Sequence, residues 1–282
     1  MRTSVFGLDV RLPGPVEGCP RRPWADRPRV HVVVDEAGGV WDSGAAEMLV
    51  CEPAGGRPLL TVETSAGAYR VAWRHIGAFV VTSDGRIVCR RDPGGEAHWE
   101  RYLTAQILPL AAVMAGIEVL HAAAVVVDGR AVGIVGPAGA GKSSTAQALV
   151  GLGAQLLTDD VLALSREDGH LVAHAGTDHV RIGPRDAKDA VPLTASGRDW
   201  PLDTLFFLER DARRPSIGRA VGFRALAGAT FNLLVRTPER LERHLDLAGT
   251  LAGEGIPVHA GFPAGAEPDE VAGSLLDWLR SR

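Results

Sequence analysis

The sequence predicts an α/β protein with a β-rich N-terminal domain, and three patterns support this prediction. Short runs of β-branched and aromatic residues, separated by turns, fill residues 1–95. An amphipathic stripe typical of a helix follows, from Trp99 to Ile117. Beyond His121, apolar strand-like runs alternate with helical ones around a glycine-rich loop, which is the pattern of an α/β core. We therefore expect two domains, residues 1–95 and residues 96–282.

The composition is that of an ordinary globular protein. Hydrophobic residues make up 46% and charged residues 23% of the 282 residues, and the net charge of −4 is spread along the chain. Nucleic-acid and membrane-surface partners favour basic patches, so neither is expected here. The three cysteines show no metal-binding spacing, and we interpret them as reduced thiols of a cytoplasmic protein.

The chain shows no pattern of a signal peptide or a membrane span. Its first residues include Asp9 and Arg11 and lack a continuous apolar region. Pro109 and Glu118 interrupt the apolar stretch Ile107–Val127, whereas a span needs about 20 residues nearly free of charge. We expect a helix that runs into a buried strand here, and Pro109 predicts a kink or a restart of that helix.

Strands and helices are predicted along both parts of the chain. The N-terminal strands are expected at residues 30–35, 59–64, 69–73, 78–83 and 86–91, the last two forming a hairpin around Asp84-Gly85. Further strands are expected at residues 121–127 and 131–135, around Asp128-Gly129, and at residues 155–164, 170–175 and 202–210. Helices are expected after the glycine-rich loop, ending at Gly151 or Gly153, and at residues 226–251 and 271–279.

The glycine-rich loop matches the phosphate-binding motif GxxxxGK[ST] in full, from Gly136 to Ser143. It follows an apolar strand and opens a helix, the context that this P-loop motif requires. Its glycines allow successive N–H groups to point toward one anion, and the helix N-terminus adds positive charge. The predicted nucleotide-binding residues are Gly136, Ala138, Gly139, Ala140, Gly141, Lys142, Ser143 and Ser144.

Two functions follow for the polar side chains of this motif. Lys142 is expected to reach the β- and γ-phosphates, and the Ser143 hydroxyl is expected to ligate Mg²⁺. A glycine-rich turn that contains Lys-Ser by chance is the alternative, but the complete motif in a strand–loop–helix context argues against it. The sequence therefore predicts a site for ATP, or another nucleoside triphosphate, with Mg²⁺.

An Asp-Asp pair follows soon after this helix, at Asp159 and Asp160. If a short helix leads into a strand beside the P-loop strand, both carboxylates come near the γ-phosphate. One can help to hold Mg²⁺, while the other accepts the proton of an attacking hydroxyl. A solvated turn is the alternative, but the apolar residues on both sides favour a functional pair. His121, a histidine beside an apolar strand, has a structural role more often than a functional one.

The stretch Leu120–Leu164 resembles the core of the HPr kinase/phosphorylase superfamily. That family has a histidine before the first core strand, a P-loop, a short helix ending in glycine, and then an Asp-Asp pair. Residues 201–210 and 226–263 look like the HPr-kinase-like serine kinases of the lasso-peptide tailoring type. The resemblance covers about residues 95–282 and is specific from His121 to Asp160.

The resemblance implies an α/β core like that of HPr kinases and of the nucleotide-binding part of phosphoenolpyruvate carboxykinases. It implies that His121 contacts phosphate, that Asp160 is the base and that Asp159 lies on the Mg²⁺ side, although the order of the two aspartates stays open. The family's phosphorolysis signature is replaced here by residues 174–186. We therefore expect no phosphorolysis, and HPr is not implied as the substrate.

A kinase that phosphorylates a hydroxyl, preferably a serine of a peptide or protein, is the leading hypothesis. A kinase of a small-molecule alcohol is the alternative within the same class. A nucleotide switch or an ATPase without an acceptor is the alternative of another class, but the chain has no NKxD or LSGGQ motif. The β-rich residues 1–95 are the expected place for acceptor recognition, and the oligomeric state stays open.

Overall fold

The computed structural model describes all residues except 24–25, 36–40, 42–45, 55–56, 93–97, 183–188, 196, 221 and 232–234. The chain forms two compact units, Met1–Ala115 and Gly116–Arg282. The sequence placed the boundary after residue 95, so the division differs by the helical segment, which belongs to the first unit. None of the described helices combines the length and apolar character that crossing a bilayer requires.

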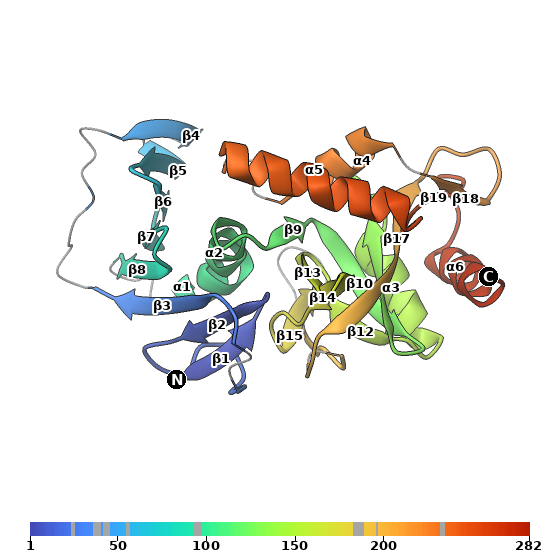
Figure 1. The fold of residues 1–282 in the computed structure, drawn as a ribbon, viewed down its shortest axis with the longest axis horizontal. Helices are drawn as coiled ribbons and strands as arrows, with labels where there is room; N and C mark the ends of the chain where they lie inside the picture. The colour runs from blue at the N-terminus through green and yellow to red at the C-terminus, as the bar shows by residue number, and fades with distance from the viewer. Residues whose placement is uncertain are drawn as a thin grey trace. The chain divides into compact units, whose positions relative to one another are not determined.

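The first unit contains one eight-stranded sheet, in the order β1-β2-β3-β8-β7-β6-β5-β4. Its strands are β1 (Arg2–Val5), β2 (Leu8–Arg11), β3 (Arg29–Val34), β4 (Glu47–Ala54), β5 (Arg57–Ser65), β6 (Ala68–Trp73), β7 (Gly77–Val81) and β8 (Arg86–Arg91) (Figure 1). The hairpin around Asp84-Gly85 is confirmed, since β7 and β8 pair antiparallel with Val81 opposite Ile87. The β1–β2 hairpin and β4 were not predicted from the sequence.

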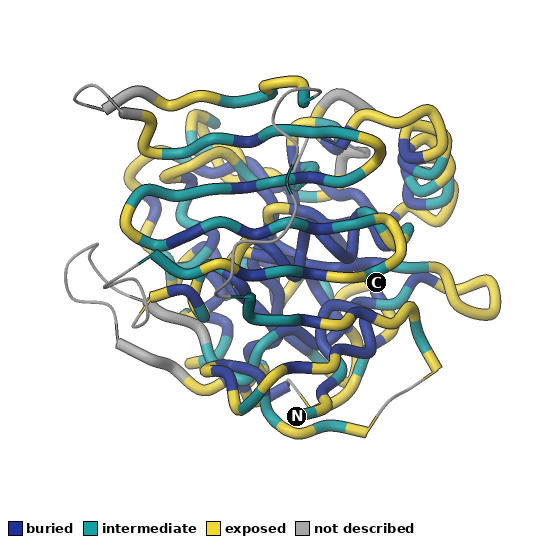
Figure 2. The backbone as a smooth tube through the Cα atoms, turned by 90° about the vertical axis from the view of Figure 1, so that its left-hand side faces the viewer, coloured by how far each residue is buried: buried dark blue, intermediate teal, exposed yellow. Residues whose placement is uncertain are grey.

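Burial alternates along these strands, as expected for a sheet with one covered face. In β7, Gly77, Phe79 and Val81 are buried, while the residues between them are half-buried. Figure 2 shows the same alternation of buried and less buried positions along neighbouring strands. The sheet therefore has a covered face and a more accessible face.

The helical segment confirms the predicted effect of Pro109. It consists of α1 (Trp99–Tyr102), the π-helical η2 (Leu103–Ile107) and α2 (Leu108–Met114), so α2 begins at Leu108 with Pro109 in its first turn. Proline has no N–H group and its ring clashes with the carbonyl one turn earlier, so a regular α-helix cannot continue through it. The π-helical turn accommodates this interruption.

The second unit contains a nine-stranded mixed sheet. Its main order is β12-β10-β11-β17-β14-β13-β9, and β19 pairs with both β17 and β18. The strands are β9 (Glu118–Leu120), β10 (Ala122–Val127), β11 (Arg130–Val135), β12 (Gln155–Thr158), β13 (Leu162–Glu167), β14 (His170–His174), β17 (Trp200–Glu209), β18 (Ser216–Ala220) and β19 (Pro257–Gly261), and β15 (His179–Ile182) pairs separately with β16 (Asp189–Pro192). The helices are α3 (Lys142–Gly151), α4 (Phe223–Gly228), α5 (Pro238–Gly253) and α6 (Pro268–Arg280).

Helices cover both faces of this sheet. In β10, Ala122, Ala124 and Val126 belong to a core cluster with residues of α4 and α5, whereas Ala123 and Val125 belong to a cluster with residues of α3 and α6. Successive side chains of a strand point to opposite faces, so the apolar run of β10 is buried on both sides. The second unit thus has the helix–sheet–helix layers expected of an α/β core.

Two predictions for the second unit need correction. Residues 155–164 were expected to form one strand, but they form β12 and β13, because a turn at residues 159–161 separates two strands with different partners. Residues 226–251 were expected to be helical throughout, but α4 ends at Gly228 and α5 begins at Pro238. Proline in the first turn of α5 and Thr237 as its N-cap, which accepts a hydrogen bond from the Arg240 N–H, fix the second start.

Candidate functional site

The glycine-rich loop leaves β11 and leads directly into α3, as the motif predicts. Gly139 and Gly141 have φ angles of 80° and 89°, a region that favours glycine. A Cβ atom added at either position would have no atom of a described residue within 4 Å, so the backbone conformation, rather than space, requires glycine here. Gly136 differs, because its Cβ would lie 3.1 Å from the Leu208 carbonyl oxygen of the neighbouring β17. The loop therefore has free space around Gly139 and Gly141 and is tightly packed at Gly136, where it begins.

The N-terminus of α3 is available to an anion. Its N-cap is Gly141, and no side chain of a described residue caps it. The first intrahelical hydrogen bond runs from the Thr145 N–H to the Gly141 carbonyl oxygen, at 2.8 Å. N–H groups in the first turn of a helix have no intrahelical acceptor, and they carry the positive end of the helix dipole. This arrangement fits a phosphate group.

The side chain of Lys142 folds back over its own loop. Its Nζ atom donates to the carbonyl oxygens of Gly136, at 2.9 Å, and Pro137, at 3.3 Å. Burial lowers the pKa of Lys142, while the negative charges of Asp160 and Asp159 act in the opposite direction. Both carboxylates are thus close enough to the ammonium group to influence its charge.

Strand directions explain why the loop and the Asp-Asp pair meet. The strand β10 runs antiparallel to both β11 and β12, so the latter two run in the same direction. Ala122 lies opposite Val135, and Ala124 lies opposite Thr158. The glycine-rich loop and Asp159 therefore follow strand ends at one edge of the sheet, and His121 precedes β10 at that edge. The expectation that β12 lies beside β11 is wrong, because β10 separates them.

The two aspartates have different environments. Asp159 is buried, with 7% of its surface exposed, whereas Asp160 is exposed. The Thr158 hydroxyl donates to the Val161 carbonyl oxygen at 2.9 Å and closes the turn that carries both residues. The sequence could not distinguish the neighbours, because their difference depends on which side of this turn faces the protein.

The remaining predicted residues also lie at this edge. The His121 side chain is exposed, and its backbone N–H donates to the Ala229 carbonyl oxygen at 2.7 Å. Ser143 is half-buried in the first turn of α3, and Ser144 is exposed. Residues 183–186, part of the segment that replaces the phosphorolysis signature, lie outside the described residues.

The sequence did not single out two further residues at this edge, Glu209 and His259. The strands β17 and β19 run parallel to β11, so Glu209 ends β17 next to the start of the loop. His259 Nε2 is hydrogen-bonded to a carboxylate oxygen of Glu209, and this bond lowers the pKa of Glu209. A charged residue directly after the apolar run of β17 was the available signal, but its histidine partner is distant in sequence.

A second polar cluster joins β13, β14 and the segment before β17. His174 is 2% exposed, and its ring nitrogens lie 3.1 Å from Asp199 Oδ2 and 2.8 Å from Ser165 Oγ. Asp199 Oδ1 accepts from the Ala175 N–H at 2.8 Å. Since both ring nitrogens have partners, we assign this histidine a structural role, with hydrogen bonds that connect the strands.

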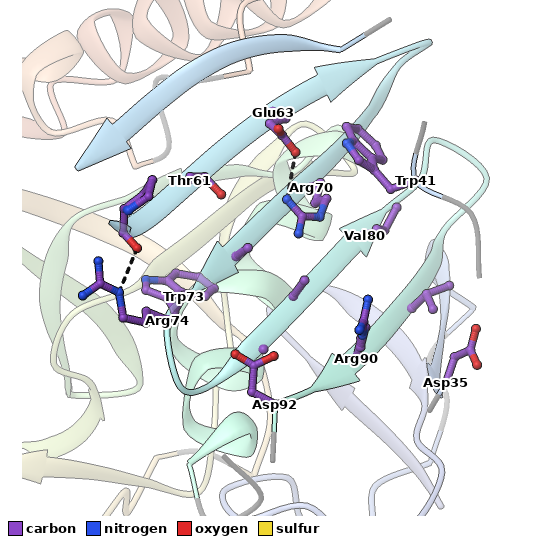
Figure 3. Close-up of a pocket in the computed structure, with 15 residues that line it drawn as sticks. Asp35, Trp41, Thr61, Glu63, Arg70, Trp73, Arg74, Val80, Arg90 and Asp92 are labelled. Atoms are coloured by element: carbon purple, nitrogen blue, oxygen red, sulfur yellow. Dashed lines mark hydrogen bonds and ion pairs between the residues drawn. The ribbon is translucent and has the colours of Figure 1, made fainter. Parts of the chain in front are cut away.

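The accessible face of the first unit carries an open hollow of about 640 Å³. Figure 3 shows its polar side chains rising from neighbouring strands. Arg70 forms an ion pair with Glu63 at 2.8 Å, and the Arg74 Nε donates to the Pro58 carbonyl oxygen at 3.2 Å. Arg90, at the end of β8, is exposed. This surface therefore presents charges of both signs next to one another.

Comparisons with known proteins give a match among solved structures alone. No protein-family model matches the chain, and no curated protein matches it. Among solved structures, the chain is similar to the Hpr(Ser) kinase/phosphatase from Coxiella burnetii, with 18% sequence identity and a TM-score of 0.36. The match covers 58% of this chain and 99% of that chain. This match assigns no function to the chain, so the function is inferred from the geometry of the site.

Proposed function

We propose that this chain is a kinase that binds ATP with Mg²⁺ at the loop from Gly136 to Ser144 and phosphorylates a hydroxyl group. One observation supports the proposal above all others. The glycine-rich loop, the ammonium group of Lys142 and the carboxylates of Asp159 and Asp160 meet at one edge of the sheet. Phosphoryl transfer to a hydroxyl requires hydrogen-bond donors that bind the phosphates. It also requires carboxylate oxygens, which can ligate the metal ion and accept the proton of the hydroxyl.

The residues divide between holding the nucleotide and carrying out the transfer. Bound ATP would supply the phosphoryl group, and Mg²⁺ would neutralise part of the negative charge of the phosphates. The loop N–H groups and Lys142 bind the phosphates, and the oxygen atoms of Ser143 and Asp159 are ligands of the kind that Mg²⁺ prefers. His121, exposed at the same edge, contacts a phosphate oxygen in this proposal.

Burial favours one division of roles between the aspartates. Asp160 is exposed, so an acceptor can approach it from solvent, whereas Asp159 is buried near Lys142. We assign Asp160 as the base. It takes the proton of the acceptor hydroxyl as that oxygen bonds to the γ-phosphorus, and the bond from the γ-phosphorus to the β-phosphate oxygen breaks.

A peptide or protein serine is the acceptor that we propose. The first unit offers two features suited to an extended chain. Its β4 pairs, among the described residues, with β5 alone and so ends the sheet, where a peptide can add as a further strand. The hollow on the accessible face presents Arg70 and Arg90 together with carboxylates, which suits polar peptide side chains.

The direct test is phosphoryl transfer by the full chain. The protein is incubated with ATP, Mg²⁺ and two panels, serine-containing peptides and small alcohols, and the products are identified by mass spectrometry. Phosphate on a peptide serine supports the proposal. Phosphate confined to small alcohols would show the alternative kinase, and ATP hydrolysis without a phosphorylated product would indicate an ATPase.

A further inference from the structure

Four basic residues form a row across the neighbouring strands β1, β2, β3 and β8 of the first unit (Figure 1). Arg2 lies opposite Arg11 in the antiparallel pair of β1 and β2. In the two parallel pairs that follow, Arg11 lies opposite His31 of β3, and His31 lies opposite Arg86 of β8. Residues opposite one another on paired strands share a face of the sheet, and neighbouring strands are about 4.8 Å apart. The four side chains therefore stand next to one another on one face.

The row lies on the accessible face of the sheet, and all four of its residues are exposed. Val30 and Val32, on either side of His31, are 3% and 1% exposed. Because side chains alternate along a strand, these valines point to the covered face and His31 points to solvent. Arg29, two residues before His31, is exposed and shares its face. A third arginine thus lies beside Arg11 and the rest of the row.

An open hollow of about 380 Å³ lies over these residues. Its lining includes Arg11, Arg29, His31, Arg86 and Asp84. It has no lining residue in common with the larger hollow on the same face, which we propose for the acceptor. Three guanidinium groups and one imidazole therefore border a single space, with one carboxylate beside them.

The positive charge of this hollow exceeds what its own carboxylate can neutralise. Within the part of the chain that the structure describes, neither Arg11 nor Arg86 forms an ion pair, and the His31 side chain forms no hydrogen bond. The Asp84 carboxylate offsets part of the charge of Arg86, and it accepts hydrogen bonds from the Thr82 hydroxyl and, at 3.3 Å, from the Arg86 N–H. Like charges on opposite residues of paired strands destabilise a sheet. An anion in the hollow would relieve this repulsion.

The turn between β7 and β8 fixes the backbone around the hollow. Gly85 has a φ of 81°, and a Cβ atom there would lie 2.4 Å from the Arg29 carbonyl oxygen. Only glycine permits so close an approach. The Gly85 carbonyl oxygen accepts a hydrogen bond from the His31 N–H at 2.9 Å. These contacts hold β3 against the turn, and a site that is already in place loses less conformational entropy on binding.

We propose that this hollow binds the phosphate group of a phosphorylated peptide side chain. Guanidinium groups can donate two parallel hydrogen bonds to phosphate oxygens, and arginine clusters recognise phosphorylated peptides. The hollow is open to solvent and has room for the phosphate together with the side chain that carries it. Asp84 would repel further anionic groups, so the site favours one phosphate over a nucleic acid or an anionic membrane, which engage more basic side chains.

This inference concerns binding alone and does not depend on the proposed kinase function. An acceptor without phosphate lacks the group that these arginines bind, so substitutions in this hollow should leave the docking of an unphosphorylated acceptor unchanged.

The first test is isothermal titration calorimetry on the full chain without ATP. The probe is a heptapeptide of glycine and alanine with one central phosphoserine, and the matched peptide carries serine instead. We expect one phosphopeptide per chain and an affinity about tenfold or more lower for the serine peptide, because the charge-assisted hydrogen bonds are lost. Equal binding of the two peptides, or no binding of the phosphopeptide at millimolar concentration, would overturn the proposal.

Two further ligands test the chemistry of the occupant. Inorganic phosphate and a short deoxythymidine oligonucleotide should both bind less tightly than the phosphopeptide. Phosphate that binds as tightly as the phosphopeptide would show a site for the free ion, and tighter binding of the oligonucleotide would show a nucleic-acid site. Either result would overturn the assignment to a peptide.

Variants locate the site. Arg11→Gln and Arg29→Gln should each weaken phosphopeptide binding about tenfold or more, whereas Arg101→Gln, exposed on α1 and outside the hollow, should leave it unchanged. Arg11→Gln should not lower the free energy of unfolding, since it removes a charge from a row of like charges. A loss of binding in Lys142→Ala, with Arg11→Gln unaffected, would place the phosphate at the glycine-rich loop and contradict the proposal.

Discussion

The Nζ atom of Lys142 lies 2.9 Å from the carbonyl oxygen of Gly136, the first residue of its own loop. This contact keeps the ammonium group buried inside the loop, and burial lowers the pKa of Lys142. A phosphate in the loop would offer the ammonium a charged acceptor in place of neutral carbonyl oxygens, and charge-assisted hydrogen bonds are about twice as strong. The lysine is thus positioned for an anion.

Lys142→Ala should weaken ATP·Mg²⁺ binding at least tenfold and abolish transfer, because it removes the charge that meets the phosphates. Calorimetry and a transfer assay on both proteins measure this. Arg130→Ala is the control, since Arg130 is the exposed first residue of β11, at the end of the strand away from the loop, and its ion pair with Asp203 is long, at 3.8 Å. Unchanged affinity and turnover in Lys142→Ala would remove the basis for a nucleotide site.

Asp160→Asn should retain ATP binding and reduce phosphoryl transfer by about 100-fold or more, because an amide cannot accept the acceptor's proton. Asp159→Asn should instead lower the affinity for Mg²⁺, since one anionic ligand is lost. Transfer rates at several Mg²⁺ concentrations distinguish the two effects.

The control for these aspartates is Asp168→Asn. Asp168 is exposed in the β13–β14 turn with a φ of 48°, a conformation that asparagine tolerates. This variant should behave like the parent protein. If Asp159→Asn loses transfer at saturating Mg²⁺ while Asp160→Asn stays active, the two roles are reversed.

Gly141→Ala should destabilise the loop by about 1–2 kcal/mol, because an L-residue is strained at its φ of 89°. Among the described residues, no atom lies within 4 Å of the added Cβ, so the loss should appear as weaker ATP binding rather than as a misfolded core. Gly151→Ala, in the last turn of α3 with equally open space, should raise the free energy of unfolding by about 0.5–1 kcal/mol. Calorimetry and urea denaturation compare the two, and normal ATP affinity in Gly141→Ala would show that the loop conformation is not needed.

Arg90→Ala should raise the KM for a peptide acceptor and leave the KM for ATP unchanged, if the hollow of the first unit binds the acceptor. Steady-state kinetics with each substrate varied in turn test this. Arg86→Ala is matched to it, because Arg86 is also exposed and begins the same strand. An equal effect of both substitutions would indicate a general effect of charge rather than a docking site.

Cysteine alkylation should be selective. Burial raises the pKa of Cys89 to about 12, and Cys19 is also buried, whereas Cys51 is exposed. Iodoacetamide at pH 8 should modify Cys51 alone, and denaturant should expose the other two, as peptide mass spectrometry can show. An unfolded cysteine ionises near pH 8.5, so the unfolding free energy should fall as the pH rises from about 9 to 12. Modification of Cys89 in the folded protein would contradict this account.

Several elements depend on local signals, and the sequence determined them. Asp128 and Gly129 have φ angles of 48° and 79°, and they form the turn that joins β10 and β11. The end of α3 follows from Gly153, whose φ is 100° and whose N–H donates to the Val150 carbonyl oxygen at 3.0 Å. These features involve residues close together in the chain, so they can be predicted from the sequence without knowledge of the fold.

Tertiary structure alone decided which strands are neighbours and which charges are buried. No local sequence pattern predicts that β10 lies between β11 and β12, or that His259 of β19 forms a hydrogen bond with Glu209 of β17. Glu118 appeared in the sequence only as an interruption of an apolar run, yet packing of α5 against β9 encloses it beside Arg240 and His244. Adjacent in sequence, Asp159 and Asp160 still differ in burial. Pairing and burial depend on contacts between residues far apart in the chain, whereas turns, caps and the phosphate-binding loop depend on the backbone preferences of a few consecutive residues.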